Sequence, residues 1–206
     1  MIYLITDRRM LQPPTAKPGL TDLPAFIERA LSGGVDMIQI RERDLAARDL
    51  FSLTEQAARI ATSYGARILI NDRADIAAAT GTGVHLTTRS LRPETVREVF
   101  GPEMLIGAST HSLEEATAAE RGGADFVVFG PVFETESKKI YGPPVGLESL
   151  GEVTGKLSIP VFALGGIRLS NFDRALDRGA AGIAAISLFT EAEDIESVVR
   201  KIKSKR

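Results

Sequence analysis

The sequence contains no cysteine among its 206 residues, which excludes disulfides and thiolate metal sites. No segment approaches the roughly 18 uninterrupted apolar residues that a membrane helix requires. The start of the chain, MIYLITDRRM, lacks the basic segment and long apolar middle of a secretory signal. A formal net charge of −2 gives no electrostatic reason to expect nucleic acid. These absences favour a cytoplasmic protein with neither a nucleic acid nor a membrane partner.

The chain also lacks any Ser/Gly-rich linker, charge block or low-complexity tract that would divide it. With 44% hydrophobic residues, a chain of 206 residues is long enough for one domain with a substantial core. We therefore expect residues 1–206 to form a single domain. The sequence does not set the oligomeric state, and a homodimer is among the states it allows.

Short apolar runs rich in Ile, Val and Phe recur along the chain, with amphipathic segments between them. The runs are continuous rather than alternating, which is typical of parallel strands covered on both faces. The pattern predicts strands at 2–6, 37–40, 68–70, 83–86, 105–109, 126–130, 160–165 and 182–187. Eight strands alternating with helices predict an α/β fold, a single (β/α)8 TIM barrel. A doubly wound open sheet is the main alternative, because the helix signals at 90–99 and 147–156 are weak.

Polar clusters follow the carboxyl ends of most predicted strands, where a TIM barrel forms its active site. They read QIRERD, NDRAD, STHS, TESKK, GGIR and ISLF in chain order. The Pro-rich segment 7–22, after the first predicted strand, is long enough to cover the mouth of the barrel.

Gln39 and Arg41 lie two positions apart and so project to the same side of their strand, into the barrel mouth, and Arg43 continues the spacing. Guanidinium groups with an amide suit phosphate or diphosphate oxygens, because the Arg fork accepts paired oxygens. The alternative is a surface ion-pair network among Arg41, Glu42, Arg43 and Asp44.

Asn71 ends the third predicted strand and can donate to or accept from a ligand. The carboxylate of Asp72, together with water, could hold a hard cation at this position. A helix N-cap is the alternative for both residues, since Asn and Asp are favoured there.

After the sixth predicted strand, Lys138 brings a positive charge, and Thr135 and Ser137 bring hydroxyl donors. We expect Lys139 to be a solvated neighbour. A small phosphorylated or diphosphorylated metabolite would fit these groups together with Arg41 and Asn71.

Gly165 and Gly166 would let the backbone approach a ligand, and a helix starting near Ser170 would point N–H groups toward an anion. Ile186 and Ser187 would complete a phosphate site, because the loops after strands seven and eight commonly cradle phosphate in this fold. A tight turn explains the two glycines equally well.

Segments along nearly the whole chain resemble the thiamine phosphate synthase superfamily, which includes the thiazole tautomerase. They read YLITDR, IQIRERDL, LINDRADIA, GVHL, IGASTHSLEEA, GADFVVFGPVFETESKK, PVGLESL, IPVFALGGI and GAAGIAAISLF. The resemblance implies a TIM barrel and a transferase that joins hydroxymethylpyrimidine diphosphate to hydroxyethylthiazole phosphate. Diphosphate would leave first, and the thiazole nitrogen would then trap the pyrimidine cation.

The resemblance also implies roles for individual residues. Arg41, Ser109 and Lys138 would be catalytic, and Asp72 would be one of two magnesium-binding aspartates. With Ser137 added from its hydroxyl group, and with Arg43 standing where the family usually has lysine, the predicted substrate-binding set is Gln39, Arg41, Arg43, Asn71, Ser109, Thr135, Ser137, Lys138, Gly166, Ile186 and Ser187.

Two departures matter, and neither the synthase pattern nor the tautomerase pattern is complete. Ser90 stands where the second magnesium aspartate is expected, which puts Mg2+ in question, and Arg89 adds a positive charge beside it. A serine here is closer to the tautomerase branch, yet the histidine expected of a tautomerase is replaced by Pro131. A thiazole tautomerase-like isomerase and a non-catalytic binder of thiazole phosphate or thiamine phosphate therefore stay open as alternatives. We expect His85 and His111 to be structural or to support other site residues.

Overall fold

The computed structural model describes residues 1–11, 22–135 and 143–205. Ser137, Lys138 and Lys139 lie outside the described residues, and so does 12–21, most of the segment predicted to cover the barrel mouth. In the described part of the chain, no helix is long and apolar enough to cross a membrane.

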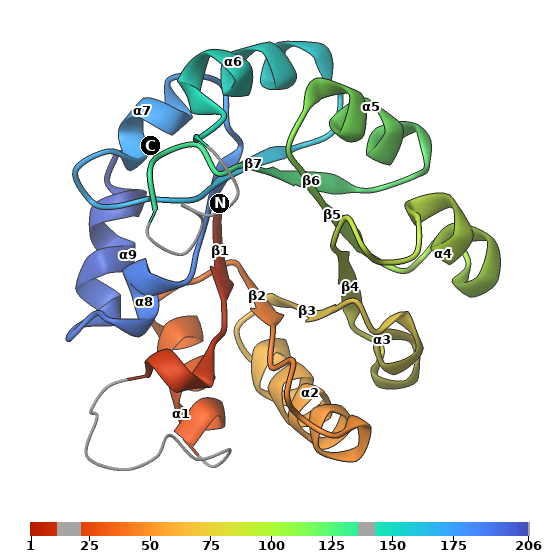
Figure 1. The fold of residues 1–206 in the computed structure, drawn as a ribbon. Helices are drawn as coiled ribbons and strands as arrows, with labels where there is room; N and C mark the ends of the chain where they lie inside the picture. Colours follow the sequence, from red (N-terminus) through yellow and green to blue (C-terminus); the bar gives the residue numbers. More distant parts are fainter. Residues whose placement is uncertain (12–21, 136–142, 206) are drawn as a thin grey trace.

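Among the described residues, eight parallel strands pair in sequence order, and the last pairs with the first, so the sheet closes into a barrel with helices around it (Figure 1). The strands are β1 (Ile2–Ile5), β2 (Met37–Ile40), β3 (Arg67–Asn71), β4 (Gly83–Leu86), β5 (Ile106–Thr110), β6 (Phe126–Phe129), β7 (Val161–Leu164) and β8 (Gly182–Ala185). The closed barrel confirms the predicted TIM barrel and excludes the open doubly wound sheet.

A helical segment follows every strand in the described part of the chain. These segments are η1 (Arg8–Met10), α1 (Asp22–Ser32), α2 (Ala47–Thr62), α3 (Ala74–Thr80), α4 (Pro93–Phe100), α5 (Leu113–Arg121), α6 (Gly146–Lys156), α7 (Phe172–Leu176), α8 (Ser187–Thr190) and α9 (Ile195–Lys203). The weak helix signals at 90–99 and 147–156 correspond to α4 and α6. The eighth strand ends two residues earlier than predicted, because Ser187 begins α8. The helix expected near Ser170 begins at Phe172.

Side chains divide between two cores because successive residues of a strand point to opposite faces. Ile38 and Ile40 of β2, for example, belong to the core between the strands and the helices. The barrel interior is filled by Tyr3, Ile5, Met37, Leu69, Phe126, Val128, Phe162 and Ala184. This division explains why the strand sequences are apolar at every position.

Aromatic rings form an apolar floor inside the barrel. The ring centroids of Phe126 and Phe162 lie 5.3 Å apart, and those of Tyr3 and Phe126 lie 5.6 Å apart in an edge-to-face arrangement. Gly107 leaves space for this floor, because a Cβ there would lie 2.3 Å from the ring of Phe126. Further along the strands the inward positions become polar, for instance from Met37 to Gln39 two residues later in β2. The floor therefore supports a polar layer at the carboxyl end of the barrel.

Candidate active site

A chain of hydrogen bonds joins Gln39, Asn71 and Asp72 across β2 and β3. Gln39 Nε2 donates to Asn71 Oδ1 at 2.9 Å, and Asn71 Nδ2 donates to Asp72 Oδ2 at 2.8 Å. Because an ionised carboxylate only accepts, it fixes the orientation of both amides. Gln39 is 2% exposed, and its Oε1 has no hydrogen-bond partner in the described residues. The chain thus ends in a buried acceptor that a ligand N–H group would satisfy.

Asp72 is held on its other side by the loop that follows β4. Its carboxylate accepts from Asn71 Nδ2 at 2.8 Å, Thr87 N at 2.9 Å and Thr87 Oγ1 at 3.3 Å, and also from Ser90 Oγ. Its backbone has φ 61°, a left-handed conformation that is uncommon for residues other than glycine. The N-cap of α3 is Arg73, without a side-chain cap, so the capping alternative for Asp72 is wrong. Asp72 instead ties the loops after β3 and β4 together.

The acidic neighbours of Arg41 and Arg43 are engaged elsewhere. Arg8, just after β1, pairs with Glu42 at 2.8 Å and with Asp44 at 2.6 Å. The alternative of an ion-pair network within 41–44 is therefore wrong. In the described residues, neither Arg41 nor Arg43 forms an ion pair, and burial together with the nearby Arg43 lowers the pKa of Arg41. Because the charge of Arg43 destabilises the Arg41 cation, an anion close to both would be favoured.

The backbone of Arg41 is fixed from β1. Thr6 Oγ1 accepts from the Arg41 N–H at 3.0 Å and donates to the buried carboxylate of Glu42 at 2.7 Å. Glu42 therefore stabilises the fold. Its fixed position leaves Arg41 and Arg43 available to a ligand.

The loops after β6 and β7 lie against each other at the mouth of the barrel. Phe133 N donates to Gly165 O at 3.0 Å, and a Cβ on Gly166 would lie 2.3 Å from the carbonyl oxygen of Glu134. Gly165 and Gly166 both have positive φ, 97° and 63°. Close packing and the turn together require both glycines. The same contact brings Thr135 to the neighbourhood of Gly166.

The loop after β7 is closed by Asn171, which donates to Gly166 O at 2.9 Å and accepts from Arg168 N at 2.8 Å. Ile186 is half-buried against the barrel interior, and the exposed Ser187 is the first residue of α8. Gly166, Ile186 and Ser187 therefore follow neighbouring strands at the same end of the barrel.

Ser109, in β5, is linked to a residue that the sequence had not connected with it. His85 Nε2 lies 2.8 Å from Ser109 Oγ, and His85 Nδ1 lies 3.2 Å from the hydroxyl of Tyr3. His85 is 2% exposed, and burial lowers its pKa to about 4. Its place opposite Asn71, in a strand whose inward positions face the site, is the signal that would have pointed to it.

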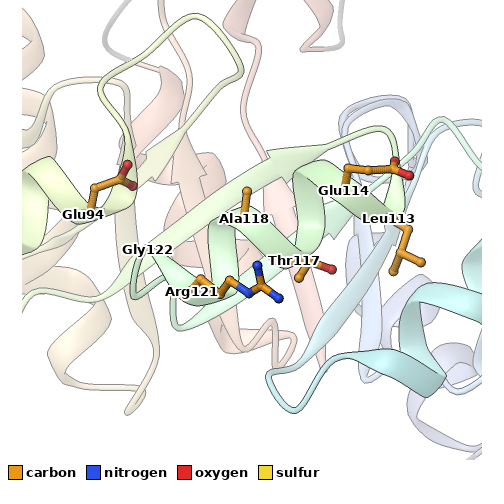
Figure 2. A pocket seen from close by; sticks show the side chains of 7 residues that line it. All are labelled: Glu94, Leu113, Glu114, Thr117, Ala118, Arg121 and Gly122. Atoms are coloured by element: carbon orange, nitrogen blue, oxygen red, sulfur yellow. The ribbon is translucent and has the colours of Figure 1, made fainter.

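Two cavities lie outside this group of residues. A groove of about 690 Å³ runs along α5 toward Glu94 of α4; Figure 2 shows Leu113, Glu114, Thr117 and Arg121 along its helical side. A second cavity of about 280 Å³ is lined by His111 together with residues of α5 and α6. Among the described residues, none of those predicted for substrate binding lines either cavity.

Comparison with known proteins identifies the family. The family model described as thiamine monophosphate synthase matches residues 2–189. A protein of Geobacter sulfurreducens is 49% identical over 187 residues, covering 90% of this chain and 84% of the relative. The thiamine-phosphate synthase of Chlorobium luteolum is 45% identical, covering 86% of this chain and 84% of the relative. The chain belongs to the thiamine monophosphate synthase family.

A solved structure agrees with this assignment. The thiamine phosphate pyrophosphorylase from Pyrococcus furiosus superimposes with a TM-score of 0.86 at 34% identity, covering 99% of this chain and 94% of that chain. The predicted family is confirmed, and with it the prediction of a transferase of thiamine biosynthesis.

Set against the synthase pattern, the Ser90 substitution places a hydroxyl directly on the Asp72 carboxylate. No group of three or more His, Cys, Asp or Glu side chains able to hold a metal occurs in the part of the chain described. Mg2+ commonly takes only one or two carboxylates and fills its remaining positions with phosphate oxygens and water. Asp72 fits such a site as its one carboxylate, although four donors already occupy its oxygens.

His111 does not supply the histidine that is replaced by Pro131. Its Nδ1 bonds to the carbonyl oxygen of Gly130, and its exposed ring faces the cavity beside α6. Phe129, which lines the same cavity, belongs to the outer core between strands and helices. His111 therefore does not place at the barrel mouth the histidine that the tautomerase alternative requires.

The buried His85 should make stability depend on pH. Its folded pKa of about 4 lies below its ordinary value of 6.5, so in this interval the unfolded chain binds more protons. The stability that His85 contributes as a neutral side chain is fully present above its ordinary pKa, and it is lost as the pH falls toward and through its folded pKa. At about pH 5 we expect the loss to be on the order of 2 kcal/mol. Urea unfolding of the wild type and of His85→Gln at neutral and acid pH measures it, and equal pH dependence in both proteins would contradict it.

Proposed function

We propose that this protein joins hydroxymethylpyrimidine diphosphate to hydroxyethylthiazole phosphate and releases diphosphate. The observation that carries the proposal is the Arg41 guanidinium, partly buried, unpaired in the described residues and next to the equally unpaired Arg43. A protein does not favour this arrangement without an anion, because burial and like charge both destabilise the cation. A diphosphate supplies paired oxygens that match both forks.

Bond cleavage follows from this electrostatic arrangement. The C–O bond between the pyrimidine methylene and the diphosphate breaks, and its electron pair leaves on the diphosphate oxygen. Arg41, Arg43 and Lys138 would stabilise that developing charge, a form of catalysis that usually contributes more than any other. The thiazole nitrogen then donates its lone pair to the methylene carbon, and the new C–N bond completes the product.

Gln39 and the loops would orient the two substrates. Gln39 Oε1, left without a partner by the chain that Asp72 anchors, would accept from the amino group of the pyrimidine. The backbone at Gly166, Ile186 and Ser187, with the hydroxyls of Thr135 and Ser137, would hold the thiazole phosphate. Holding both reactants in one orientation converts their encounter into an intramolecular step.

Magnesium, when bound, would offset charge on the departing diphosphate, and Asp72 is the carboxylate that would hold it. The free metabolites that this reaction uses are consistent with a cytoplasmic location, which we include in the proposal.

The decisive experiment supplies the purified protein with both substrates and measures diphosphate and thiamine phosphate, with and without Mg2+. Equal amounts of the two products would support the proposal. Isomerisation of a thiazole phosphate without diphosphate release would establish a tautomerase instead. Tight binding of thiazole phosphate or thiamine phosphate without turnover would establish a binding protein.

Replacing Lys138 with Ala should lower kcat by about a hundredfold or more and weaken substrate binding far less. The reason is that the charge of Lys138 is needed mainly as the C–O bond breaks. Single-turnover kinetics and substrate titration separate the two effects. Lys139→Ala is the matched control, since we expect Lys139 to be solvated. Equal turnover in Lys138→Ala and the wild type would mean that Lys138 is a solvated surface residue without a role in the reaction.

A further inference from the structure

His85 is a buried titratable side chain that the proposed reaction does not use. It lies in β4 between two hydroxyl groups from distant strands, with Nδ1 at 3.2 Å from Tyr3 Oη and Nε2 at 2.8 Å from Ser109 Oγ. Tyr3 is fully buried on the apolar floor, whereas Ser109 is half-buried at the carboxyl end of β5. The three residues therefore form a line that runs from the floor of the barrel toward its mouth.

The position of the proton on the His85 ring follows from these contacts. In the described residues the hydroxyl of Tyr3 has His85 Nδ1 as its one hydrogen-bond partner, and burial raises the pKa of Tyr3, so this hydroxyl keeps its proton. A buried O–H needs an acceptor, so Nδ1 must carry a lone pair. An imidazole with a lone pair on Nδ1 carries its single proton on Nε2.

This tautomer determines what Ser109 can offer. The Nε2–H group donates to Ser109 Oγ, so the hydroxyl hydrogen of Ser109 cannot point back at His85. It must point to another acceptor. Asn71, which pairs with His85 across the two strands, and the nearby Arg41, whose charge acts on the His85 ring, line the same end of the barrel. The acceptor that suits this setting is an anionic oxygen.

We propose that Tyr3 and His85 are positioning residues that hold the Ser109 hydroxyl as a donor to a diphosphate oxygen of the substrate. The identity of the acceptor rests on the proposed function, whereas the orientation of the hydroxyl rests on the contacts of Tyr3, His85 and Ser109 alone. Without His85 the hydroxyl would rotate freely and its hydrogen bond to the substrate would be weaker.

A double-mutant cycle tests the catalytic part. His85→Leu should lower kcat/KM about tenfold. His85→Gln, which keeps an N–H near the position of Nε2, should stay within about threefold of the wild type. In a Ser109→Ala background, His85→Leu should have almost no further effect. The proposal would be overturned if the losses in kcat/KM from His85→Leu and Ser109→Ala multiplied in the double mutant. It would also be overturned if His85→Gln were as impaired as His85→Leu although both variants unfold at the same temperature as the wild type.

The orientation is tested without any assay of activity. Nitrogen-15 NMR of the histidines in the substrate-free protein should show His85 protonated on Nε2, and Tyr3→Phe should weaken that preference. Tyr3→Phe also serves where His85→Leu does not fold, since it keeps the ring and removes only the hydroxyl. Finding the proton on Nδ1 in the wild type would overturn the inference. The expected tautomer in a protein that releases no diphosphate would instead leave the orientation intact and overturn the proposed function.

Discussion

Arg41→Gln is expected to lower kcat/KM for diphosphate release by about a hundredfold to a thousandfold, the usual effect of removing one preorganised donor from a developing oxyanion. The side chain keeps its length and hydrogen-bonding capacity in part, but it loses the charge and the fork that binds paired oxygens. Steady-state kinetics with the pyrimidine diphosphate as the varied substrate measures the change. Arg43→Gln should cost less, below about tenfold, because Arg43 is exposed and solvent screens its charge.

Arg41→Gln should be at least as stable as the wild type. Arg41 has no ion-pair partner in the described residues, and burial and the charge of Arg43 both lower its pKa. Removing such a cation removes an unfavourable charge rather than a favourable contact. Urea unfolding should therefore give a free energy equal to or above that of the wild type. A marked loss of stability would mean that Arg41 holds the fold, and the loss of activity would then say nothing about diphosphate.

The barrel could be predicted from the sequence because each strand is apolar at consecutive positions, the pattern of strands buried on both faces. The strand ends could not all be predicted by the same signal. In ISLF the apolar pattern simply continues past Ala185, so periodicity could not show that Ser187 begins a helix.

The positions of the candidate-site residues were predictable where those residues lie in one strand or directly after it. Gln39 and Arg41 follow from spacing alone, and the structure places both at the carboxyl end of β2. Contacts between distant segments were not predictable. The ion pairs of Arg8 with Glu42 and Asp44 span more than thirty residues. The hydrogen bonds of His85 with Tyr3 and Ser109 join three strands. Only the closed barrel brings such residues together.

Ser90→Asp is expected to create a tighter Mg2+ site and to destabilise the protein in the absence of metal. Ser90 Oγ now donates to Asp72 Oδ1, and an aspartate there would place a second carboxylate against the first. Two carboxylates at hydrogen-bond distance repel each other, so we expect the free energy of unfolding to fall by about 1–3 kcal/mol in a metal chelator. Mg2+ offsets that repulsion, because it binds the folded state and stabilises it by mass action.

Two measurements decide this last prediction. Thermal unfolding with increasing Mg2+ should raise the Tm of Ser90→Asp well above its metal-free value and that of the wild type only slightly. Thr88→Asp, which adds the same charge at an exposed position two residues away, should behave like the wild type. Diphosphate release at limiting Mg2+ should be faster in Ser90→Asp than in the wild type. Superimposable Mg2+ curves for Ser90→Asp and the wild type would mean that the metal does not bind at Asp72.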